Sequence, residues 1–136
     1  MVKFAAAVVI SFWSLIATAT DWQVVADTEV GQLRLDKSTV TKDGQYTSAI
    51  LVYQFNDSQK IATPPYALFN LRMDDVLVDC AAPTLGVQAR RFYQDDTLVS
   101  TFTLKHEEVK FNPPAPNTMA ETVVKAVCAV VPKIKP

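Results

Sequence analysis

The chain has 136 residues, a length that allows one hydrophobic core and one domain. Its 13 Lys and Arg and 14 Asp and Glu give a formal net charge of −1 without a basic stripe, which excludes the electrostatic signature of nucleic-acid binding. Only 3 glycines are present, which excludes glycine-rich loops that cradle phosphate groups.

Residues 1–19 are predicted to be a secretory signal peptide. After Lys3, an apolar run extends from Phe4 to Ile16 and is followed by the small-x-small sequence Ala17-Thr18-Ala19. This run is shorter than the ~20 residues of a membrane-spanning helix, although an uncleaved anchor is the alternative. Because no cysteine lies near the cleavage site, we expect an exported protein without a lipid anchor. Residues 20–136 would form its single domain.

The segment after the signal peptide predicts strands, because apolar and polar residues alternate. This alternation is seen in Asp21–Ala26 and again in Gly31–Asp36. Asp36-Lys37-Ser38 then predicts a turn, followed by a short extended piece over residues 39–41. The next turn is a hairpin at residues 42–45, which contain the favoured Asp-Gly pair.

The strongest strand prediction is Tyr46–Phe55. Its centre, Ala49–Tyr53, is apolar at every position, so we expect it in the middle of a sheet with at least one face covered. The following residues, 56–65, are polar and end in Pro64-Pro65. They are predicted to form a surface loop.

A long apolar segment, Tyr66–Cys80, changes the parity of its apolar positions. Up to Met73 the apolar residues occupy odd positions, and from Val76 they occupy even positions. Since successive side chains of a strand point to opposite faces, this change predicts a β-bulge at Asp74-Asp75. A hairpin at the same place is the alternative.

Two further strands, Leu85–Tyr93 and Thr97–Leu104, flank Gln94-Asp95-Asp96 and predict a hairpin. A charged extension follows over residues 105–110. A proline-rich connection then leads to the last element.

The last element is predicted to be a helix over Thr118–Val131. Thr118 and Glu121 have the spacing of a capping box. Pro132 disfavours helical backbone in the residue before it. The apolar stripe of this helix would be Ala120, Val123, Val124, Val127, Cys128 and Val131. A buried strand is the alternative, because valine is a middling helix former.

The chain contains 2 cysteines, Cys80 and Cys128. In an exported protein the default is one disulfide, which here would join the end of a strand to the helix. The alternative, two free thiols with a metal or redox role, lacks a CxxC spacing or a nearby histidine. The predicted fold is therefore α+β. An antiparallel sheet of about six strands carries a C-terminal helix packed on one face and tethered by the disulfide.

The other face of this sheet would be solvated, covered by loops or paired with a second copy. The apolar residues of Ala49–Tyr53 favour pairing, so a homodimer is predicted.

No catalytic or metal-binding constellation is found in the sequence. His106 is the only histidine, and in a strand it would point away from its neighbour Glu107, so it is interpreted as part of a charged strand edge. Asp74-Asp75 is interpreted as a bulge and Asp95-Asp96 as a turn. We therefore predict a protein that is not an enzyme, without catalytic residues, metal ligands or cofactor.

Arg90-Arg91 is the one pair that suggests ligand contact. Together with Phe92 and Tyr93, these arginines suit an anionic or aromatic ligand. Consecutive residues of a strand point to opposite faces, however, so one outward and one partly covered arginine is the alternative.

Several short motifs occur in a recognisable order. They are Trp22, Leu33-Arg34-Leu35-Asp36, Asp79-Cys80-Ala81, Arg91-Phe92-Tyr93, Pro116-Asn117-Thr118 and Val127-Cys128. In this order and spacing the chain resembles the surface-adhesin protein E family of Gram-negative bacteria, over nearly all of residues 20–136.

The resemblance implies a small exported domain with an antiparallel sheet and a C-terminal helix tethered by Cys80–Cys128. It also implies a dimeric surface lipoprotein that binds host proteins such as vitronectin, laminin and plasminogen, with haem as a further ligand. The chain departs from the family in two respects. It lacks a cysteine for lipid attachment, and Thr63-Pro64-Pro65 stands where the family carries basic residues tied to ligand binding.

The favoured function is a non-enzymatic exported binding domain of this type. Its partner would be a host matrix protein, a cell-envelope protein or a second copy, met in the periplasm or at the cell surface. The binding residues are unknown, but an exposed sheet face, the hairpin Leu85–Leu104 and the loop Asn56–Pro65 are candidates. The alternative is a periplasmic protein that holds a small molecule or haem between sheet and helix.

Overall fold

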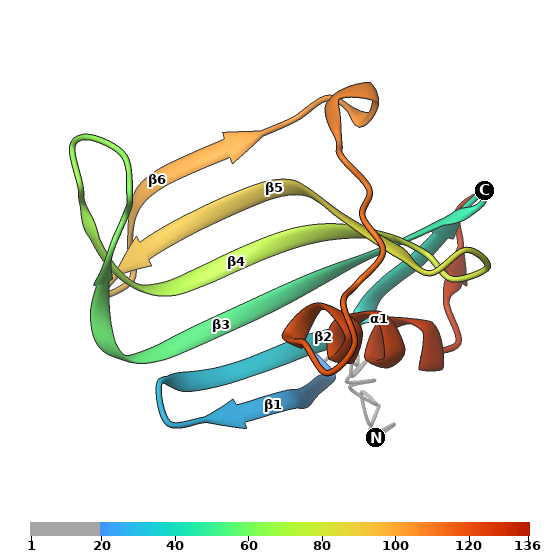
Figure 1. The fold of residues 1–136 in the computed structure, drawn as a ribbon, viewed down its shortest axis with the longest axis horizontal. Helices are drawn as coiled ribbons and strands as arrows, with labels where there is room; N and C mark the ends of the chain where they lie inside the picture. The colour runs from blue at the N-terminus through green and yellow to red at the C-terminus, as the bar shows by residue number, and fades with distance from the viewer. Residues whose placement is uncertain (1–19) are drawn as a thin grey trace, which may run out of the picture.

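The structure, a computed structural model, describes residues 20–136, so the predicted signal peptide lies outside the described residues. Six strands form one antiparallel sheet in chain order, each paired with the next (Figure 1). The strands are β1 (Trp22–Thr28), β2 (Gly31–Asp43), β3 (Tyr46–Lys60), β4 (Leu68–Asp79), β5 (Thr84–Gln94) and β6 (Thr97–Thr103). The six-stranded antiparallel sheet and the single α-helix predicted at its C-terminal end are confirmed.

Three shorter elements complete the described chain. They are the 3-10 helix η1 (His106–Glu108), the helix α1 (Met119–Ala129) and the two-residue strand β7 (Lys133–Ile134). Strand β7 pairs with β2 in parallel orientation at Thr41 and Lys42, which the sequence did not indicate. These two residues lie beyond the part of β2 that pairs with β1.

Helix α1 begins as predicted and ends early. Thr118 is its N-cap, and the Thr118 hydroxyl accepts a hydrogen bond from the Glu121 backbone N–H at 3.4 Å. The Glu121 carboxylate pairs with Lys125 at 2.9 Å. The predicted end at Val131 is wrong: Val130 is already extended, and Val131 is 92% exposed. The chain leaves the helix there to reach β7.

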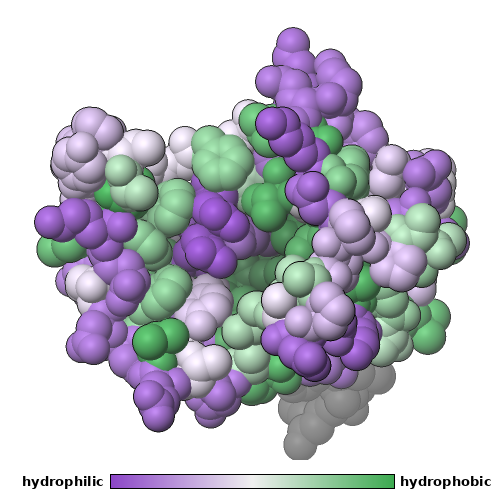
Figure 2. Space-filling model, in the orientation of Figure 1, coloured by the Kyte–Doolittle hydropathy of each residue, from purple (hydrophilic) through white to green (hydrophobic). Residues whose placement is uncertain are grey.

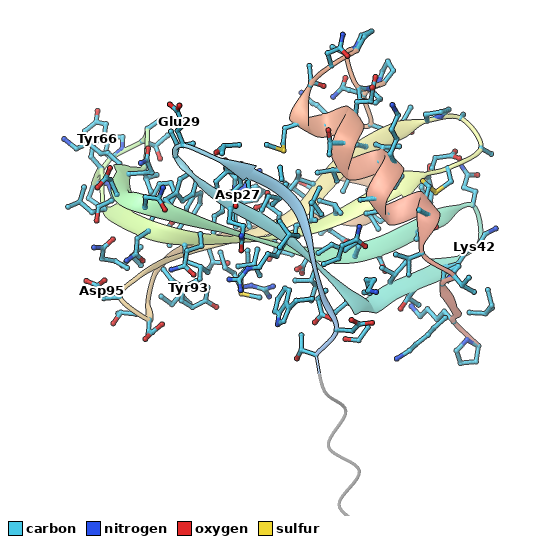
Figure 3. The ribbon with its side chains drawn as sticks, turned by 90° about the horizontal axis from the view of Figure 1, so that it is seen from below. Asp27, Glu29, Lys42, Tyr66, Tyr93 and Asp95 are labelled. Carbon is cyan, nitrogen blue, oxygen red and sulfur yellow. A yellow bond between two sulfur atoms is a disulfide. The ribbon has the colours of Figure 1, made fainter. Side chains whose placement is uncertain are left out.

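The main core lies between α1 and one end of the sheet. Its buried helix residues are Val123, Val124 and Val127, and they join buried side chains of β2, β3 and β4. The sheet members are Leu33, Leu35, Val40, Ala49, Leu51, Val76 and Val78. We call the sheet surface that carries these residues the helix face and the opposite surface the open face. Helix α1 covers one end of the helix face and leaves the other end without a helix (Figures 1 and 3).

The predicted disulfide is present. Cys80, which follows β4, is bonded to Cys128 in the last turn of α1, with their Cα atoms 5.8 Å apart. The two free thiols considered as the alternative are therefore wrong. The bond ties the C-terminal end of the helix to the strand that supplies Val76 and Val78 to the core.

Strand β4 contains neither the predicted bulge nor the alternative hairpin at Asp74-Asp75. Its pairing with β3 continues without a shift from Leu71 to Asp79. The bulge lies across from it on β5, where Asp75 faces Ala89 but Val76 faces Val87. Even-numbered residues of β4 point to the helix face and odd-numbered residues to the open face. Apolar side chains line both faces, and Asp74 takes the place of an apolar residue on the helix face. The apolar positions therefore change from odd to even without a bulge in β4.

Two other boundaries differ from the prediction for a similar reason. The expected turn at Asp36–Ser38 is an irregularity within β2, where Ser38 N–H donates to the Asp36 carboxylate at 3.1 Å. Strand β3 continues to Lys60, so the predicted loop begins only after residue 60. In both places the pairing with a neighbouring strand is interrupted, between Asp36 and Thr41 of β2 and between Gln54 and Gln59 of β3, and it resumes with a shifted register.

The two predicted hairpin turns are confirmed. Gly44, between β2 and β3, has φ +60°, a value that suits glycine. Asp95 and Asp96, between β5 and β6, have φ +46° and +67°, as the two central residues of a type I′ turn require.

A strap, residues 104–118, returns from β6 to the start of α1. Leu85 and Asn112 exchange backbone hydrogen bonds of 3.0 and 3.1 Å, and Val109 of the strap is buried. Gly86 of β5 lies directly under it, so that a Cβ atom at this position would collide with a methyl group of Val109. Close contact between strap and sheet therefore requires glycine at position 86.

We expect Cys128→Ser to lower the free energy of unfolding by about 4 kcal/mol, because it opens a loop that spans 48 residues. The corresponding fall in melting temperature is roughly 15 °C. Calorimetry with and without reductant measures it. Reduced wild type should match the variant, and an unchanged melting temperature would contradict the role assigned to the disulfide.

We expect Gly86→Ala to cost about 1–3 kcal/mol, because the new methyl group displaces Val109. Amide hydrogen exchange at Leu85 and Asn112 should accelerate as the strap loosens. Gly44→Ala is the matched control. A Cβ atom at position 44 would meet no other atom, but the positive φ there should lower the free energy of unfolding by about 1 kcal/mol. Hydrogen exchange at Leu85 and Asn112 should not change. Slow exchange at Leu85 and Asn112 in Gly86→Ala would show that the strap is held elsewhere.

Candidate binding surface

The part of the helix face beyond α1 contains a cluster of two arginines and one aspartate. Arg90 binds the Asp74 carboxylate through two nitrogens, Nε at 2.7 Å and Nη2 at 2.9 Å. Arg72 Nε lies 3.3 Å from the same carboxylate. Strand pairing places all three side chains on one face, because Asp74 lies opposite Leu51 on β3 and opposite Arg90 on β5.

The cluster carries one positive charge that is not balanced within it. Asp74 is buried and satisfied by Arg90, whereas the Nε–H of Arg72 lacks an aligned acceptor within residues 20–136. Burial lowers the pKa of Arg72 below its ordinary value; the Asp74 carboxylate opposes this shift and Arg90 adds to it. A guanidinium so placed favours a ligand that brings an anionic or hydrogen-bond-accepting group.

Aromatic rings continue from this cluster toward the end of the sheet opposite α1. The Arg72 guanidinium lies 5.6 Å from the centre of the Tyr53 ring. Tyr53 stacks on Phe55 with ring centres 4.4 Å apart, and Phe69 packs edge-on between Phe55 and Phe92 at 5.5 and 4.8 Å. These contacts hold the rings in place.

We call this set the arginine–aromatic patch; it comprises Tyr53, Phe55, Arg72, Asp74, Arg90 and Phe92. On the side of the molecule that carries α1, Figure 2 shows a surface hollowed near its centre. Hydrophobic and hydrophilic side chains lie next to one another there. Such mixed aromatic and arginine surfaces are typical of protein-binding sites.

An open groove of about 720 Å³ adjoins the patch, between β5, β6 and the strap. Val87 and Phe102 form its floor, and Pro113 of the strap and Ala120 of α1 are among its other lining residues. A smaller cavity of about 160 Å³ shares the lining residues Leu85, Val87 and Ala120 with the groove and also contains Arg72 of the patch. The groove is mainly apolar and open along one side, so it suits an inserted chain segment better than an enclosed small molecule.

The open face carries a second, more exposed set of charges. Arg91 pairs with Asp75 at 2.8 Å, and both side chains are about one-third exposed. Arg34 lies 5.3 Å from the centre of the Trp22 ring. Arg90 and Arg91 therefore point to opposite faces, as strand geometry requires, and only Arg90 belongs to the patch.

Comparison with known proteins adds a family to this geometry. Residues 22–129 match the family model described as surface-adhesin protein E. The chain belongs to the surface-adhesin protein E family. No curated protein sequence matches it significantly.

Solved structures of Haemophilus influenzae protein E share the fold. One from a non-typeable strain aligns with a TM-score of 0.56 at 14% identity, covering 94% of this chain and 83% of that one. A second aligns with a TM-score of 0.55 at 15% identity, covering 84% and 91%. A third, crystal form II, has a TM-score of 0.52 at 15% identity, covering 71% and 80%. At these identities the likeness shows the fold.

In this member of the protein E family, the remaining predicted candidates lie away from the patch. His106 lies in η1 rather than at a strand edge, and its ring contacts Tyr46 at 5.1 Å between ring centres. Within residues 20–136 no three side chains of the metal-binding types converge on one point, and no helix is long and apolar enough to cross a membrane. Asp95 contacts Asn70 at 2.9 Å, at the end of the sheet opposite α1 where Tyr66 also lies (Figure 3).

Sequence reasoning found part of the patch, because it named Arg90 and Phe92 as a possible ligand contact. It missed Arg72, the aromatic residues of β3 and the groove, since the patch residues come from three strands far apart in sequence. Their contacts depend on the pairing of β3, β4 and β5.

Adjacent aspartates on opposite faces provide a test of this geometry. Asp74→Asn should lower the free energy of unfolding by about 3 kcal/mol, because two half-buried guanidinium groups lose their counter-charge. Asp75→Asn, which breaks the more exposed pair with Arg91, should cost at most about 1 kcal/mol. Urea unfolding of both variants measures the difference, and equal losses would contradict the burial assigned to the cluster.

Proposed function

We propose that the mature protein is a non-enzymatic exported binding domain that engages a protein partner on the uncovered part of its helix face. The partner would be a host extracellular-matrix protein or a cell-envelope protein. The observation that carries this proposal is the arginine–aromatic patch beside an open apolar groove. Family membership supports an adhesin-like role.

The composition of the patch favours a protein surface with acidic and apolar groups. Tyrosine and arginine are enriched among the residues that dominate binding energy at protein interfaces. Here Arg72 carries the unbalanced charge, and Tyr53 and Phe55 beside it are held by ring contacts. Little side-chain entropy would then be lost on binding.

The same contacts argue against catalysis at this surface. A general base needs a carboxylate or imidazole that is free to take a proton. Asp74 is engaged by Arg90 through both oxygens, and Arg91 holds Asp75. The ring of His106 packs in one cluster with Tyr46 and Phe111, whose ring centres lie 5.1 and 6.3 Å from it.

The alternative of a haem or small-molecule site between sheet and helix is not supported. Val123, Val124 and Val127 fill that space. The cavity between Val123 of the helix and Leu33 and Leu51 of the sheet holds about 160 Å³, less than the 300–1,000 Å³ or so typical of ligand pockets. A larger hollow of about 560 Å³ beside Val124 and Cys128 has no strand residue in its lining, so it does not lie between helix and sheet.

We further propose that residues 20–136 act after export, in the periplasm or at the cell surface. A homodimer would use the open face, where Trp22 and Val24 are 42% and 53% exposed. Such a dimer would leave the patch and the groove on the helix face available to a partner.

Binding of the purified mature protein to immobilised vitronectin, laminin and plasminogen, the host proteins that the family resemblance implies, tests the proposal. Arg72→Gln should weaken binding at least about tenfold, or 1.4 kcal/mol, while Asp74 keeps its bond to Arg90. Arg34→Gln makes the same change on the open face and should leave binding unchanged. Equal loss in both variants would contradict the proposed surface, and absence of binding to all three proteins would contradict a host partner.

A further inference from the structure

Strand β6 is an edge strand with an unprotected side. It pairs with β5 alone, and within residues 20–136 no strand lies along its outer side. Every second residue of an edge strand directs its N–H and C=O away from the sheet, which makes such an edge a template for another strand. Natural proteins usually protect edges with charges, prolines or very short strands.

The side chains of β6 offer little of this protection. Its seven residues, TLVSTFT, include no charge and no proline. Three large apolar side chains are exposed: Leu98 by 50%, Val99 by 37% and Phe102 by 41%. A neutral, exposed edge of this kind attracts other extended segments.

The opposite edge of the same sheet is protected. Both edge strands carry a register shift, β1 between Val24 and Ala26 and β6 at Val99, so the shift does not distinguish them. Only β1 also has acidic residues, Asp27 and Glu29, along its end (Figure 3). Strand β7 pairs with β2 at Thr41 and Lys42 and brings Lys133 to the edge. One fold therefore protects one edge and leaves the other open.

Part of β6 has the regular geometry that an added strand needs. The register with β5 shifts at Val99, so the regular run is Ser100–Thr103. Within it, Phe102 lies opposite Arg90 on the helix face and also lines the apolar groove. A strand added beside this run would place alternate side chains over the groove.

We propose that β6 is a β-augmentation site, at which an extended and uncharged segment of a partner protein adds a seventh long strand beside Ser100–Thr103. This inference rests on the proposed function as a protein-binding domain. Backbone hydrogen bonds along the edge would supply affinity, and the groove would select large apolar side chains at alternate positions of the segment.

A foreign segment fits this site better than a second copy of the chain. The β6 strand of a second copy would present only Ser100 and Phe102 from its regular run to the groove. One aromatic side chain leaves much of about 720 Å³ unfilled. A partner segment with several large apolar residues would fill it.

Phage-displayed random dodecapeptides, selected on the immobilised mature protein, provide the probe. The enriched peptide is then synthesised and added to the isotope-labelled protein. Amide hydrogen exchange within Ser100–Thr103 should slow at least about tenfold, while amides of β1 remain unchanged. N-methylation of alternate peptide residues should abolish binding in one register and leave it within about twofold in the other, because only one set of N–H groups faces β6.

A matched pair of variants tests the same point from the protein side. Phe102→Lys, on the edge beside the groove, should reduce peptide binding more than tenfold. Val30→Lys, at an exposed position of the turn between β1 and β2, should have no effect. Melting curves of both variants verify that they fold.

Each other outcome overturns the edge proposal. No enriched peptide, protection of other residues, or equal tolerance of both N-methylated series would show that β6 is not the site. A free protein that is dimeric with its β6 amides already protected would make a second copy the occupant. A peptide that binds elsewhere on the helix face would leave the proposed function intact, and loss of matrix-protein binding in Arg72→Gln tests that function separately.

Discussion

The packing of three valines of α1 on one end of the sheet determines how the remaining surface is used. The helix has 11 residues and is therefore about 16 Å long, whereas β3 has 15 residues and extends for about 50 Å. A helix of this length can cover only part of a face. Cys80–Cys128 holds its C-terminal end at the sheet, so the covered part is the same in every molecule.

The uncovered part of that face must then stabilise itself by other contacts. The aromatic rings of Tyr53, Phe55 and Phe92 pack on one another and on Phe69. The carboxylate of Asp74 is neutralised by Arg90, and Arg72 is left with an unbalanced charge. Contacts that stabilise the sheet here also give it a surface suited to binding, because arginine and aromatic groups are the ones that protein partners use.

The two proposed modes of binding occupy neighbouring parts of one surface. The patch lies over β3, β4 and β5, and the groove continues from it to β6 and the strap. A partner that adds a strand to β6 would pass beside the groove. It would bring its side chains close to Arg90, which lies opposite Phe102 in the register of β5 and β6. Strand addition and side-chain recognition are therefore compatible in one complex.

Local signals in the sequence were sufficient for most elements. Alternation predicted the strands, Gly44 and Asp95-Asp96 marked the turns, and Thr118 marked the start of α1, because each of these features acts over a few residues. The disulfide followed from two cysteines in a chain that was predicted to be exported. The errors occurred where partners far apart in sequence decide the structure, as for β4, which continues through Asp74-Asp75 because β3 pairs with it throughout.

The amino-acid sequence by itself determined the class of fold, the order of its elements, the disulfide and the family. Only the tertiary structure decided which charges meet and which edge stays open. Asp74 and Asp75 are neighbours in the chain, yet one is buried between arginines and the other is partly exposed, because the sheet separates their faces. Likewise, β6 has an ordinary strand sequence. It becomes a candidate binding edge only because β5 pairs with one of its sides and no strand of the described chain lies along the other.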